Sequence, residues 1–587
     1  MGISNLVSLI EKVASIPYYS VIGDASGKIV YVSNRDGLRR TWVYDPVEKK
    51  NTPITAHPPV IAAVPRRNES TKIVYTYDAA EGRELHRICI VDIDERRESC
   101  IEEIEPMRVF SLAWDGRSIA LTGATQKKLY LIIFKDGKIL RKRELDIYID
   151  VSDVNDRYVI GYGMLSGDPR SSEIFVYDIR KDEFRAYTPR KGSINEKPIF
   201  CNGKILFESN YEDLDRKKLY TIDTELSGEP EELVFKYNDY TDFKPVEHTF
   251  YDCRNNKIYV VAKKNGRTQV FVDGKRIPTP QGLISGSLAI INNTIYYAMS
   301  SLIEPHKIHK STEGGFAEVL TNKLPDELRE AFGERYFVKI RSVDGIPVPT
   351  YIVESRKTSK PGPTVIYVHG GPWWEVPDAW SPIIASIIVS GYHVVAPNYR
   401  GSTGYGEKYR LLDIGDPGGK DLEDIVSVAK YVINEGIASD VAIAGYSYGG
   451  YMTYLATTKY PELWKAGVAG AGITDWQEQY MLSDALFKKF IEILFDGYRP
   501  DLLSDRSPIK YADRLVCPLC IIHASNDTRT PLKPVMRFME KLMESQKLFE
   551  AHIYPGLGHM LVSTDDLLRL VVPMITFLKK YYTDRKA

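Results

Sequence analysis

Ser447 lies in the segment IAGYSYGGYM (443–452), with a glycine two residues away on either side. A G-x-S-x-G pattern arises by chance in roughly one chain in five of this length. Here it follows an apolar run at 441–444 and precedes a helical pattern that begins near residue 450. A serine on a sharp turn between a strand and a helix is exposed as a nucleophile, and glycines let the two elements approach closely. The segment therefore predicts that Ser447 attacks an acyl carbon.

A serine nucleophile needs a histidine as base and a carboxylate that orients the histidine. His523 and His552 lie inside apolar strand patterns, whereas His559 follows a strand and the flexible loop PGLG. We therefore predict that His559 is the base. Asp527, in the loop ASNDTRTP after a strand, is the predicted acid, and Asp475 after another strand is the alternative. For either aspartate, capping of a helix is the structural alternative.

Two backbone donors are needed for the oxyanion that forms when the serine attacks. The N–H of Tyr448 is expected at a helix N-terminus, where negative charge is favoured. The second donor is expected from a glycine loop after a core strand, and the loop VHGGPWW (368–374) has this position. We predict that Gly371 supplies it.

These residues require a sheet whose strands end at one edge, and the pattern after about residue 325 predicts such a sheet. A hairpin pattern turns at Asp344-Gly345. Apolar runs at 364–369, 392–399, 440–447, 466–471, 519–525 and 550–555 then alternate with helical patterns such as 421–435. Continuously apolar strands with intervening helices indicate a doubly wound, mostly parallel sheet, with ligands at the carboxyl ends of its strands.

The region from about residue 21 to 325 has a different pattern. Short β-rich runs start at residues 27, 71, 116, 156, 203, 256 and 293, so their spacing is 37 to 53 residues. Four-stranded blades of a β-propeller recur at about this spacing. We predict a seven-bladed β-propeller that acts as a scaffold or gate and contributes no nucleophile or metal site.

Composition excludes several classes of partner. The 587 residues carry a net charge of −1, so there is no basic field for nucleic acid or an anionic membrane. No apolar run approaches the ~18 residues of a membrane span, and the amphipathic N-terminal pattern is not that of a signal peptide. We expect a cytoplasmic protein that binds neither nucleic acid nor membrane.

Cysteines and other potential ligands give no sign of a metal site or a cofactor. Cys517 and Cys520 have the spacing of half a zinc or redox motif, but no second half accompanies them, and we interpret them as buried strand residues. Cys89 and Cys100 could bridge a hairpin in a hyperthermophile, in which intracellular disulfides occur. No phosphate-binding loop accompanies the serine motif, so no cofactor is expected.

The motifs HGGP, NYRGSTGYGE, GYSYGGYM and NDTRTPLKP together resemble the prolyl oligopeptidase family of serine peptidases, and within it the acylaminoacyl peptidases. The resemblance extends over the whole chain, although it is loose in the propeller. It implies an α/β-hydrolase fold at 326–587, a propeller at 21–325, and an N-terminal helix within 1–20 that packs on the hydrolase domain. It also implies a triad of Ser447, Asp527 and His559.

The resemblance further implies residues that bind substrate. Arg529, two residues after the predicted acid, would bind a substrate carbonyl near the bond that is cut. Five residues fall where these enzymes build an apolar pocket, although residues at helical spacing fit a core equally well: Trp373, Trp476, Phe487, Phe490 and Ile491. Large aromatic residues there favour a hydrophobic substrate side chain.

Dipeptidyl peptidases of the family hold a free amino terminus with paired glutamates. The pairs Glu102-Glu103 and Glu231-Glu232 lack the surrounding motif, and we interpret them as solvated. The predicted function is therefore an exopeptidase that releases an N-acyl amino acid from short blocked peptides, with accompanying esterase activity. The alternatives are a dipeptidyl peptidase or oligopeptidase, a broad carboxylesterase, and a propeller scaffold with an inactive hydrolase. By analogy, edge strands near 337–353 suggest a homodimer or higher oligomer.

Overall fold

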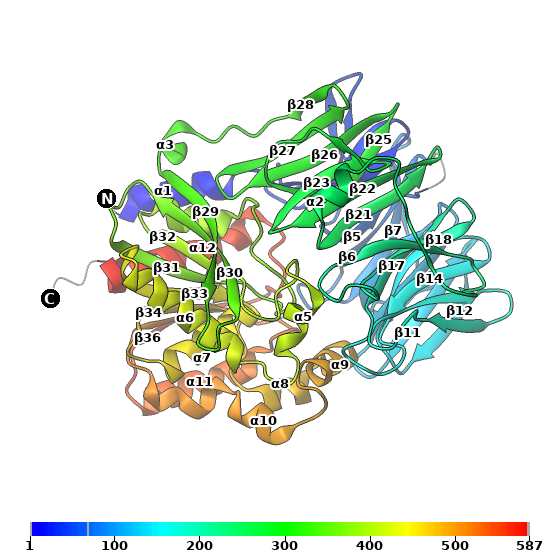
Figure 1. Ribbon diagram of the computed structural model, residues 1–587. Coiled ribbons are helices and arrows are strands. Elements are labelled where there is room, and N and C mark those ends of the chain that lie inside the picture. Colours follow the sequence, from blue (N-terminus) through cyan, green and yellow to red (C-terminus); the bar gives the residue numbers. More distant parts are fainter. Residues whose placement is uncertain (1–2, 67–69, 584–587) are drawn as a thin grey trace.

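The computed structural model describes residues 3–66 and 70–583, which form a propeller-like array of antiparallel sheets and a domain with one large mixed sheet (Figure 1). Helix α1 (Ile3–Ala14) precedes the propeller in the chain. Its buried residues Leu6, Leu9, Ile10 and Val13 nevertheless belong to the same hydrophobic core as helices of the second domain. In the part of the chain that the structure describes, no helix is long and apolar enough to cross a membrane.

Five separate four-stranded sheets occur in the described part of the propeller. The first sheet consists of β5 (Pro59–Ala63), β6 (Lys72–Asp78), β7 (His86–Asp92) and β8 (Arg97–Cys100), and the second of β9 (Arg108–Trp114), β10 (Ser118–Ala124), β11 (Leu129–Lys135) and β12 (Lys138–Leu145). The third consists of β13 (Ile149–Val154), β14 (Tyr158–Gly163), β15 (Glu173–Asp178) and β16 (Glu183–Tyr187), and the fourth of β17 (Asn195–Cys201), β18 (Lys204–Ser209), β19 (Lys218–Ile222) and β20 (Glu231–Glu232). The fifth consists of β21 (Glu247–Arg254), β22 (Lys257–Lys264), β23 (Arg267–Val272) and β24 (Lys275–Ile277).

The remaining strands of the propeller form one sheet of eight, in the order β28-β27-β26-β25-β1-β2-β3-β4. They are β1 (Tyr19–Ala25), β2 (Lys28–Ser33), β3 (Arg40–Asp45), β4 (Lys50–Pro53), β25 (Leu283–Ile291), β26 (Thr294–Ser301), β27 (Glu304–Thr312) and β28 (Gly315–Leu320). The sheet is continuous because β1 pairs with β25 at Val21 and Gly286. A Cβ atom on Gly286 would lie 2.1 Å from the carbonyl oxygen of Val21, so only glycine allows this approach. The predicted count of seven separate blades is not confirmed.

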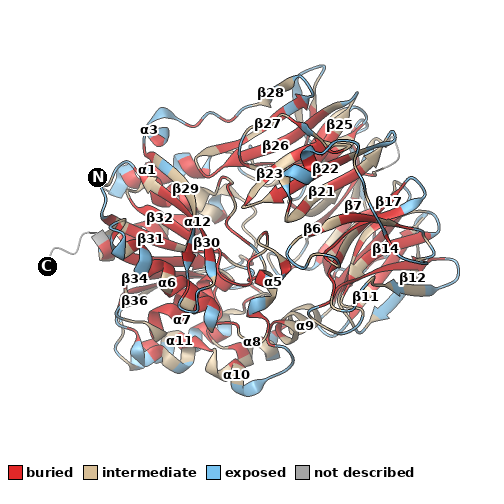
Figure 2. Cartoon of the chain, in the orientation of Figure 1, coloured by how far each residue is buried: buried red, intermediate tan, exposed pale blue. Residues whose placement is uncertain are grey.

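The first strands of five sheets surround a common cavity of about 490 Å³, to which β5, β9, β13, β17 and β21 each contribute residues. Last strands such as β12 lie at the rim and are largely exposed (Figure 2). Two disulfides stabilise this half: Cys89–Cys100 joins the neighbouring strands β7 and β8, and Cys201–Cys253 joins two sheets. A short helix, α2 (Asp239–Phe243), lies between β20 and β21.

The second domain follows α3 (Asp326–Arg329) and is built on a mixed sheet of eight strands in the order β29-β30-β32-β31-β33-β34-β35-β36. The pairs β29/β30 and β30/β32 are antiparallel, and the remaining pairs are parallel. The strands are β29 (Phe332–Arg341), β30 (Pro347–Ser355), β31 (Gly362–Val368), β32 (His393–Pro397), β33 (Ala438–Tyr446), β34 (Trp464–Gly470), β35 (Leu519–Ala524) and β36 (Phe549–Tyr554). A mostly parallel, doubly wound sheet was predicted and is present.

Helices cover both faces of this sheet. One core contains α6 (Lys420–Asn434), α7 (Tyr448–Lys459) and α11 (Leu532–Glu544), and the other contains α1, α4 (Pro382–Val389) and α12 (Thr564–Leu578). The shorter helices are α5 (Glu407–Arg410), α8 (Trp476–Leu482), α9 (Ala485–Leu494) and α10 (Pro500–Asp505). The inner strands such as β31, β32, β34 and β35 are almost wholly buried (Figure 2), which explains their continuous apolar character. The edge strands β29 and β36 are mostly half-buried. Cys517 and Cys520 are both buried, as predicted, but only Cys520 lies in a strand, because β35 begins at Leu519.

Candidate active site

Ser447 lies on the turn between β33 and α7 and has a left-handed backbone conformation, with φ 59° and ψ −122°. This conformation is strained for a residue that carries a side chain, and it points the hydroxyl away from the sheet. The flanking glycines make the turn possible. A Cβ atom on Gly445 would lie 2.4 Å from the backbone of Gly449, and one on Gly449 would lie 2.0 Å from the carbonyl oxygen of Val368.

His559 reaches Ser447 from the loop between β36 and α12. Its Nε2 lies 3.0 Å from Ser447 Oγ, and its Nδ1 lies 2.7 Å from Asp527 Oδ2. The hydroxyl of Tyr446 donates a 2.8 Å hydrogen bond to the carbonyl oxygen of His559, which fixes the loop. The structure therefore brings together the three residues proposed for the triad, which are separated by up to 112 positions in the chain.

Asp527 lies in the loop after β35 and is 4% exposed. Its Oδ1 accepts hydrogen bonds from the backbone N–H groups of Arg529 and Thr530, at 2.9 and 2.8 Å, and Thr530 Oγ1 donates to Oδ2. Burial acts to raise the pKa of Asp527. The charge and hydrogen bond of His559 and these donors outweigh burial, so the pKa is about 2. The carboxylate is thus held charged and in one orientation.

The other candidates for the triad have structural roles. Asp475 caps α8, where its side chain accepts hydrogen bonds from the backbone N–H groups of Gln477 and Glu478. His523 lies within β35 and donates through Nε2 to the carbonyl oxygen of Thr530, at 2.7 Å. His552 lies within β36. None of the three contacts Ser447 among the hydrogen bonds of the described residues.

The two segments that carry the predicted oxyanion donors both adjoin Ser447. Tyr448 is the first residue of α7, so its N–H has no partner within the helix. The Gly370-Gly371 loop passes directly over the serine, since a Cβ atom on Gly370 would lie 3.2 Å from Ser447 Cβ. The Tyr448 hydroxyl donates a 2.6 Å hydrogen bond to Asp421, a carboxyl whose pKa burial raises to about 6. This bond anchors the start of α7.

A cavity of about 1070 Å³ lies between the propeller and the hydrolase domain, and Ser447, His559 and Gly371 line it. Of the predicted pocket residues, Trp373, Phe487 and Phe490 line it as well. The Trp373 and Phe490 rings meet edge to face with centroids 5.5 Å apart.

Trp476 and Ile491 do not line this cavity, contrary to the prediction. Trp476 is fully buried, Ile491 is 2% exposed, and both belong to the hydrophobic core. The orientation of helix α9 explains the difference for Ile491, because Phe487 and Phe490 face the cavity whereas Ile491 and Leu494 face the core.

Arg529 also lines the cavity, but it has a partner that sequence reasoning missed. Its Nε donates to both carboxylate oxygens of Glu84, at 2.9 and 3.0 Å. Glu84 lies between β6 and β7 of the propeller and is 3% exposed. Arg108, also from the propeller, pairs with Glu84 and donates to Asp484 at the start of α9. No local pattern identifies a partner 445 residues away.

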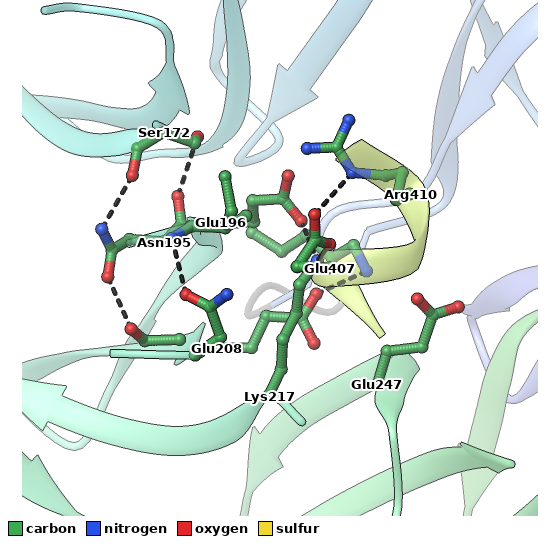
Figure 3. Close-up of polar contacts among 12 residues, drawn as sticks. Ser172, Asn195, Glu196, Glu208, Lys217, Glu247, Glu407 and Arg410 are labelled. Carbon is green, nitrogen blue, oxygen red and sulfur yellow. Dashed lines mark hydrogen bonds and ion pairs between the residues drawn. The ribbon is translucent and has the colours of Figure 1, made fainter. Parts of the chain in front are cut away.

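The propeller side of the cavity is charged, and sequence reasoning missed this too. Four glutamates line the cavity, two from the propeller and two from the hydrolase domain, and two propeller lysines pair with all of them. Lys217 contacts Glu196 and Glu407 at 2.6 and 2.9 Å (Figure 3). Lys263 contacts Glu247 at 2.8 Å and also pairs with Glu375.

Asp150, also in the cavity wall, accepts a 2.8 Å hydrogen bond from the Tyr148 hydroxyl. Burial raises the pKa of Asp150 to about 7. Among the described residues, one group of three side chains has the spacing of a metal site, namely Cys89, Glu98 and Cys100. Its two sulfurs are joined in a disulfide and are not free to bind a metal.

Comparison with known proteins gives the family. Residues 10–309 match the family model described as the N-terminal domain of acylamino-acid-releasing enzyme-like proteins, and residues 381–585 match that of the prolyl oligopeptidase family. The chain belongs to the prolyl oligopeptidase family. Its N-terminal domain is of the acylamino-acid-releasing enzyme type.

Relatives with a curated name match mainly one part of the chain. The acylamino-acid-releasing enzyme of Homo sapiens is 30% identical over 230 residues, which are 37% of this chain and 31% of that protein. Dipeptidyl peptidase family member 6 of Caenorhabditis elegans is 31% identical over 209 residues, which are 34% of this chain and 28% of that protein. The chain thus spans about a third of the length of these relatives.

Solved structures match over nearly the whole chain and show the same fold. Pyrococcus horikoshii acylaminoacyl peptidase has a TM-score of 0.72 at 18% identity and covers 98% of both chains. A Mycobacterium tuberculosis puromycin-hydrolyzing peptidase has a TM-score of 0.81 at 18% identity and covers 98% of this chain and 96% of its own.

Proposed function

We propose that this protein is a serine peptidase that hydrolyses short N-acylated peptides and releases an N-acyl amino acid, with accompanying esterase activity. The observation that carries the proposal is the connected series of Ser447 Oγ, His559 and Asp527, at 3.0 and 2.7 Å. These are the contacts that a general base needs to activate a hydroxyl.

The reaction follows from this geometry. As Ser447 Oγ bonds to the substrate carbonyl carbon, His559 Nε2 takes the hydroxyl proton, and Asp527 stabilises the imidazolium that forms. The N–H groups of Gly371 and Tyr448 donate to the oxyanion. His559 then gives its proton to the leaving amine, the carbon–nitrogen bond breaks, and an acyl-enzyme remains. Water attacks the ester in a second cycle of the same steps and frees the acyl amino acid.

Three aromatic residues support a preference for a hydrophobic side chain on the residue whose carbonyl is attacked. Trp373, Phe487 and Phe490 present their rings to the cavity that contains Ser447. Arg529 keeps its expected role in binding a substrate carbonyl, and Glu84 orients its guanidinium for that purpose.

The pairing of charges favours a blocked amino terminus over a free one. A free α-ammonium needs a carboxylate that has no cation of its own. Each of the four glutamates that line the cavity already pairs with Lys217 or Lys263. Asp150 is the remaining carboxyl of the lining, and burial raises its pKa to about 7, which disfavours its charged form. A dipeptidyl peptidase, the function named for one relative, is therefore the second candidate.

A panel of peptides tests the proposal and its alternatives. Acetyl-blocked and free-amine peptides of equal length, each with Phe before the cut bond, are compared by kcat/KM, with p-nitrophenyl caprylate as the ester. We expect the blocked peptides to be cut at least tenfold more efficiently. A preference for free amines would indicate a dipeptidyl peptidase, and hydrolysis of the ester alone would indicate a carboxylesterase. Failure of a fluorophosphonate to label the protein would indicate an inactive scaffold.

We further infer the architecture that serves this reaction. The eight-stranded sheet counts as two blades, so the propeller comprises seven within 21–325, and the hydrolase domain comprises 326–587 with the N-terminal helix of 1–20 packed on it. The propeller covers the cavity and excludes folded proteins, so native casein should be cut far more slowly than a short peptide. A cytoplasmic location and assembly into a homodimer or larger oligomer stay predictions.

A further inference from the structure

Lys217 and Lys263 occupy equivalent positions between the two domains. Each lies on the propeller and contacts one glutamate of the propeller and one of the hydrolase domain. Their side chains are only 7% and 8% exposed. Figure 3 shows Lys217 between Glu196 and Glu407, which lies at the start of α5. A buried ammonium between two carboxylates is held firmly, because losing either contact leaves a charge without a partner.

The ion pairs of both lysines are connected to the same short loop of the hydrolase domain, residues 371–375. Lys263 reaches it directly, since Glu375 ends the loop. Lys217 reaches it through Glu407, which accepts a hydrogen bond from Arg410 (Figure 3). The Arg410 guanidinium lies over the Trp373 ring, 5.5 Å from its centroid.

The edge of the Trp373 ring is held as well. Its Nε1–H donates a 3.1 Å hydrogen bond to Asp413, a carboxyl whose pKa burial raises to about 8. The ring therefore contacts a guanidinium over its face and a carboxyl of the hydrolase domain at its edge, and the guanidinium is linked to the propeller through Glu407. Loop 371–375 carries both Gly371 and Trp373, so one segment contains a proposed oxyanion donor and a wall of the pocket.

We propose that Lys217 and Lys263 of the propeller are positioning residues that fix loop 371–375 for catalysis. Lys263 acts through Glu375 and sets the position of the Gly371 donor, and Lys217 acts through Glu407 and Arg410 and sets the Trp373 ring. This inference rests on the proposed function in that it takes Gly371 as an oxyanion donor. It makes the propeller a part of the active-site framework in addition to a cover.

Charge explains why the two lysines are needed. Burial acts to raise the pKa of Glu407, but Arg410 and Lys217 outweigh it and hold the pKa at about 2. Burial does raise the pKa of Glu375, against the opposing charge of Lys263. Without Lys263, burial and the neighbouring Glu247 would favour the neutral form of Glu375, and the ion pair that holds the loop to the propeller would be lost.

The neighbouring residue Lys218 provides a matched control. It also contacts two glutamates, Glu212 and Glu232, at 2.8 and 2.9 Å. Both of these lie on the propeller, and the Lys218 side chain is 33% exposed. Replacing Lys218 by Met removes the same charge and the same number of contacts without affecting a bridge between the domains.

The experiment compares K263M, K217M and K218M in the full-length protein. The first measurement is the rate constant for labelling of Ser447 by a fluorophosphonate. This reaction depends on the oxyanion donors but not on how the pocket binds a peptide side chain. We expect K263M to slow labelling at least tenfold and K218M to change it less than twofold. The second is the ratio of kcat/KM for acetyl-Phe and acetyl-Ala anilides, which K217M should lower at least fivefold and K217R should largely restore.

Two further variants guard against loss of folding. E375Q keeps the volume of the side chain and should slow labelling as K263M does, and the double variant K263M/E375Q should be no slower than either single one. Labelling of K263M and E375Q at the rate of K218M would overturn the proposal. Slow labelling of these variants in an enzyme that cuts no blocked peptide would leave the positioning role in place and reject the proposed substrate.

Discussion

The two walls of the central cavity differ in the kind of residue they present. The hydrolase wall carries Ser447, His559 and the aromatic rings of α9, whereas the propeller wall carries lysines and glutamates that neutralise one another. Groups that react must change their charge during the cycle, so they lie where a fixed backbone surrounds them. Side chains in ion pairs keep their charge throughout, so they can hold the two domains in a fixed relative position. The comparison indicates that the reacting groups belong to the hydrolase domain, whereas both domains hold those groups in position.

Replacing the nucleophile tests the hydrolase wall most severely. The variant S447A should lose peptidase activity by a factor of roughly 10⁴ to 10⁶, because the acyl-enzyme has no oxygen on which to form. Hydrolysis of an acetyl-Phe anilide measures this loss, and circular dichroism checks that the fold is kept. Activity within tenfold of the native enzyme would place the reaction elsewhere.

Replacing the acid should have the next largest effect. D527N should lower kcat by about 10⁴, because the amide can hold His559 in the wrong tautomer. The pKa of Asp527 is about 2 in the folded protein, below its ordinary value near ~3.9. Its charge thus stabilises the folded state by about 2 kcal/mol above pH ~4, and this contribution is lost as the pH falls through about 2.

Denaturant unfolding at several pH values measures that contribution. The native protein should lose more of its free energy of unfolding between pH 4 and pH 2 than D527N does. Equal losses in the two proteins would mean that Asp527 is not held charged by its surroundings.

The two faces of α9 separate the pocket from the core. F490A should lower kcat/KM for acetyl-Phe substrates about tenfold and change Tm little, because Phe490 lines the cavity. I491A should do the reverse and cost about 2–4 kcal/mol of unfolding free energy, because Ile491 is buried in the core. If I491A changed the Phe-to-Ala preference more than F490A, our assignment of the two faces would be wrong.

The two disulfides also distinguish the two halves of the chain, and removing one should affect activity less than any of the substitutions above. Both disulfides lie in the propeller, whereas Cys517 and Cys520 of the hydrolase domain belong to neither of them. Replacing Cys201 and Cys253 by Ser removes a cross-link over 52 residues, which should cost about 4 kcal/mol of stability. Calorimetry should detect a lower Tm, with kcat/KM at 25 °C within twofold. A large loss of activity instead would indicate that this cross-link shapes the cavity.

The sequence by itself determined the local features of the site. Ser447 and its flanking glycines specify a turn through neighbours within two residues, and the apolar runs place Asp527 and His559 after strands that end at one edge. These are consequences of backbone geometry and of residue periodicity, which short segments contain in full. The recurring β-rich starts likewise predicted a propeller, although they did not predict that β1 and β25 would join two groups of strands in one sheet.

Only the tertiary structure decided which residues meet across the domains. Phe490 and Ile491 are adjacent and both apolar, so only the packing of α9 separates pocket from core. The contacts of Arg529 with Glu84 and of Lys217 with Glu407 join residues far apart in the chain. A charged side chain looks the same in the sequence whether it faces water or a partner, because burial and pairing arise from the packing of the domains.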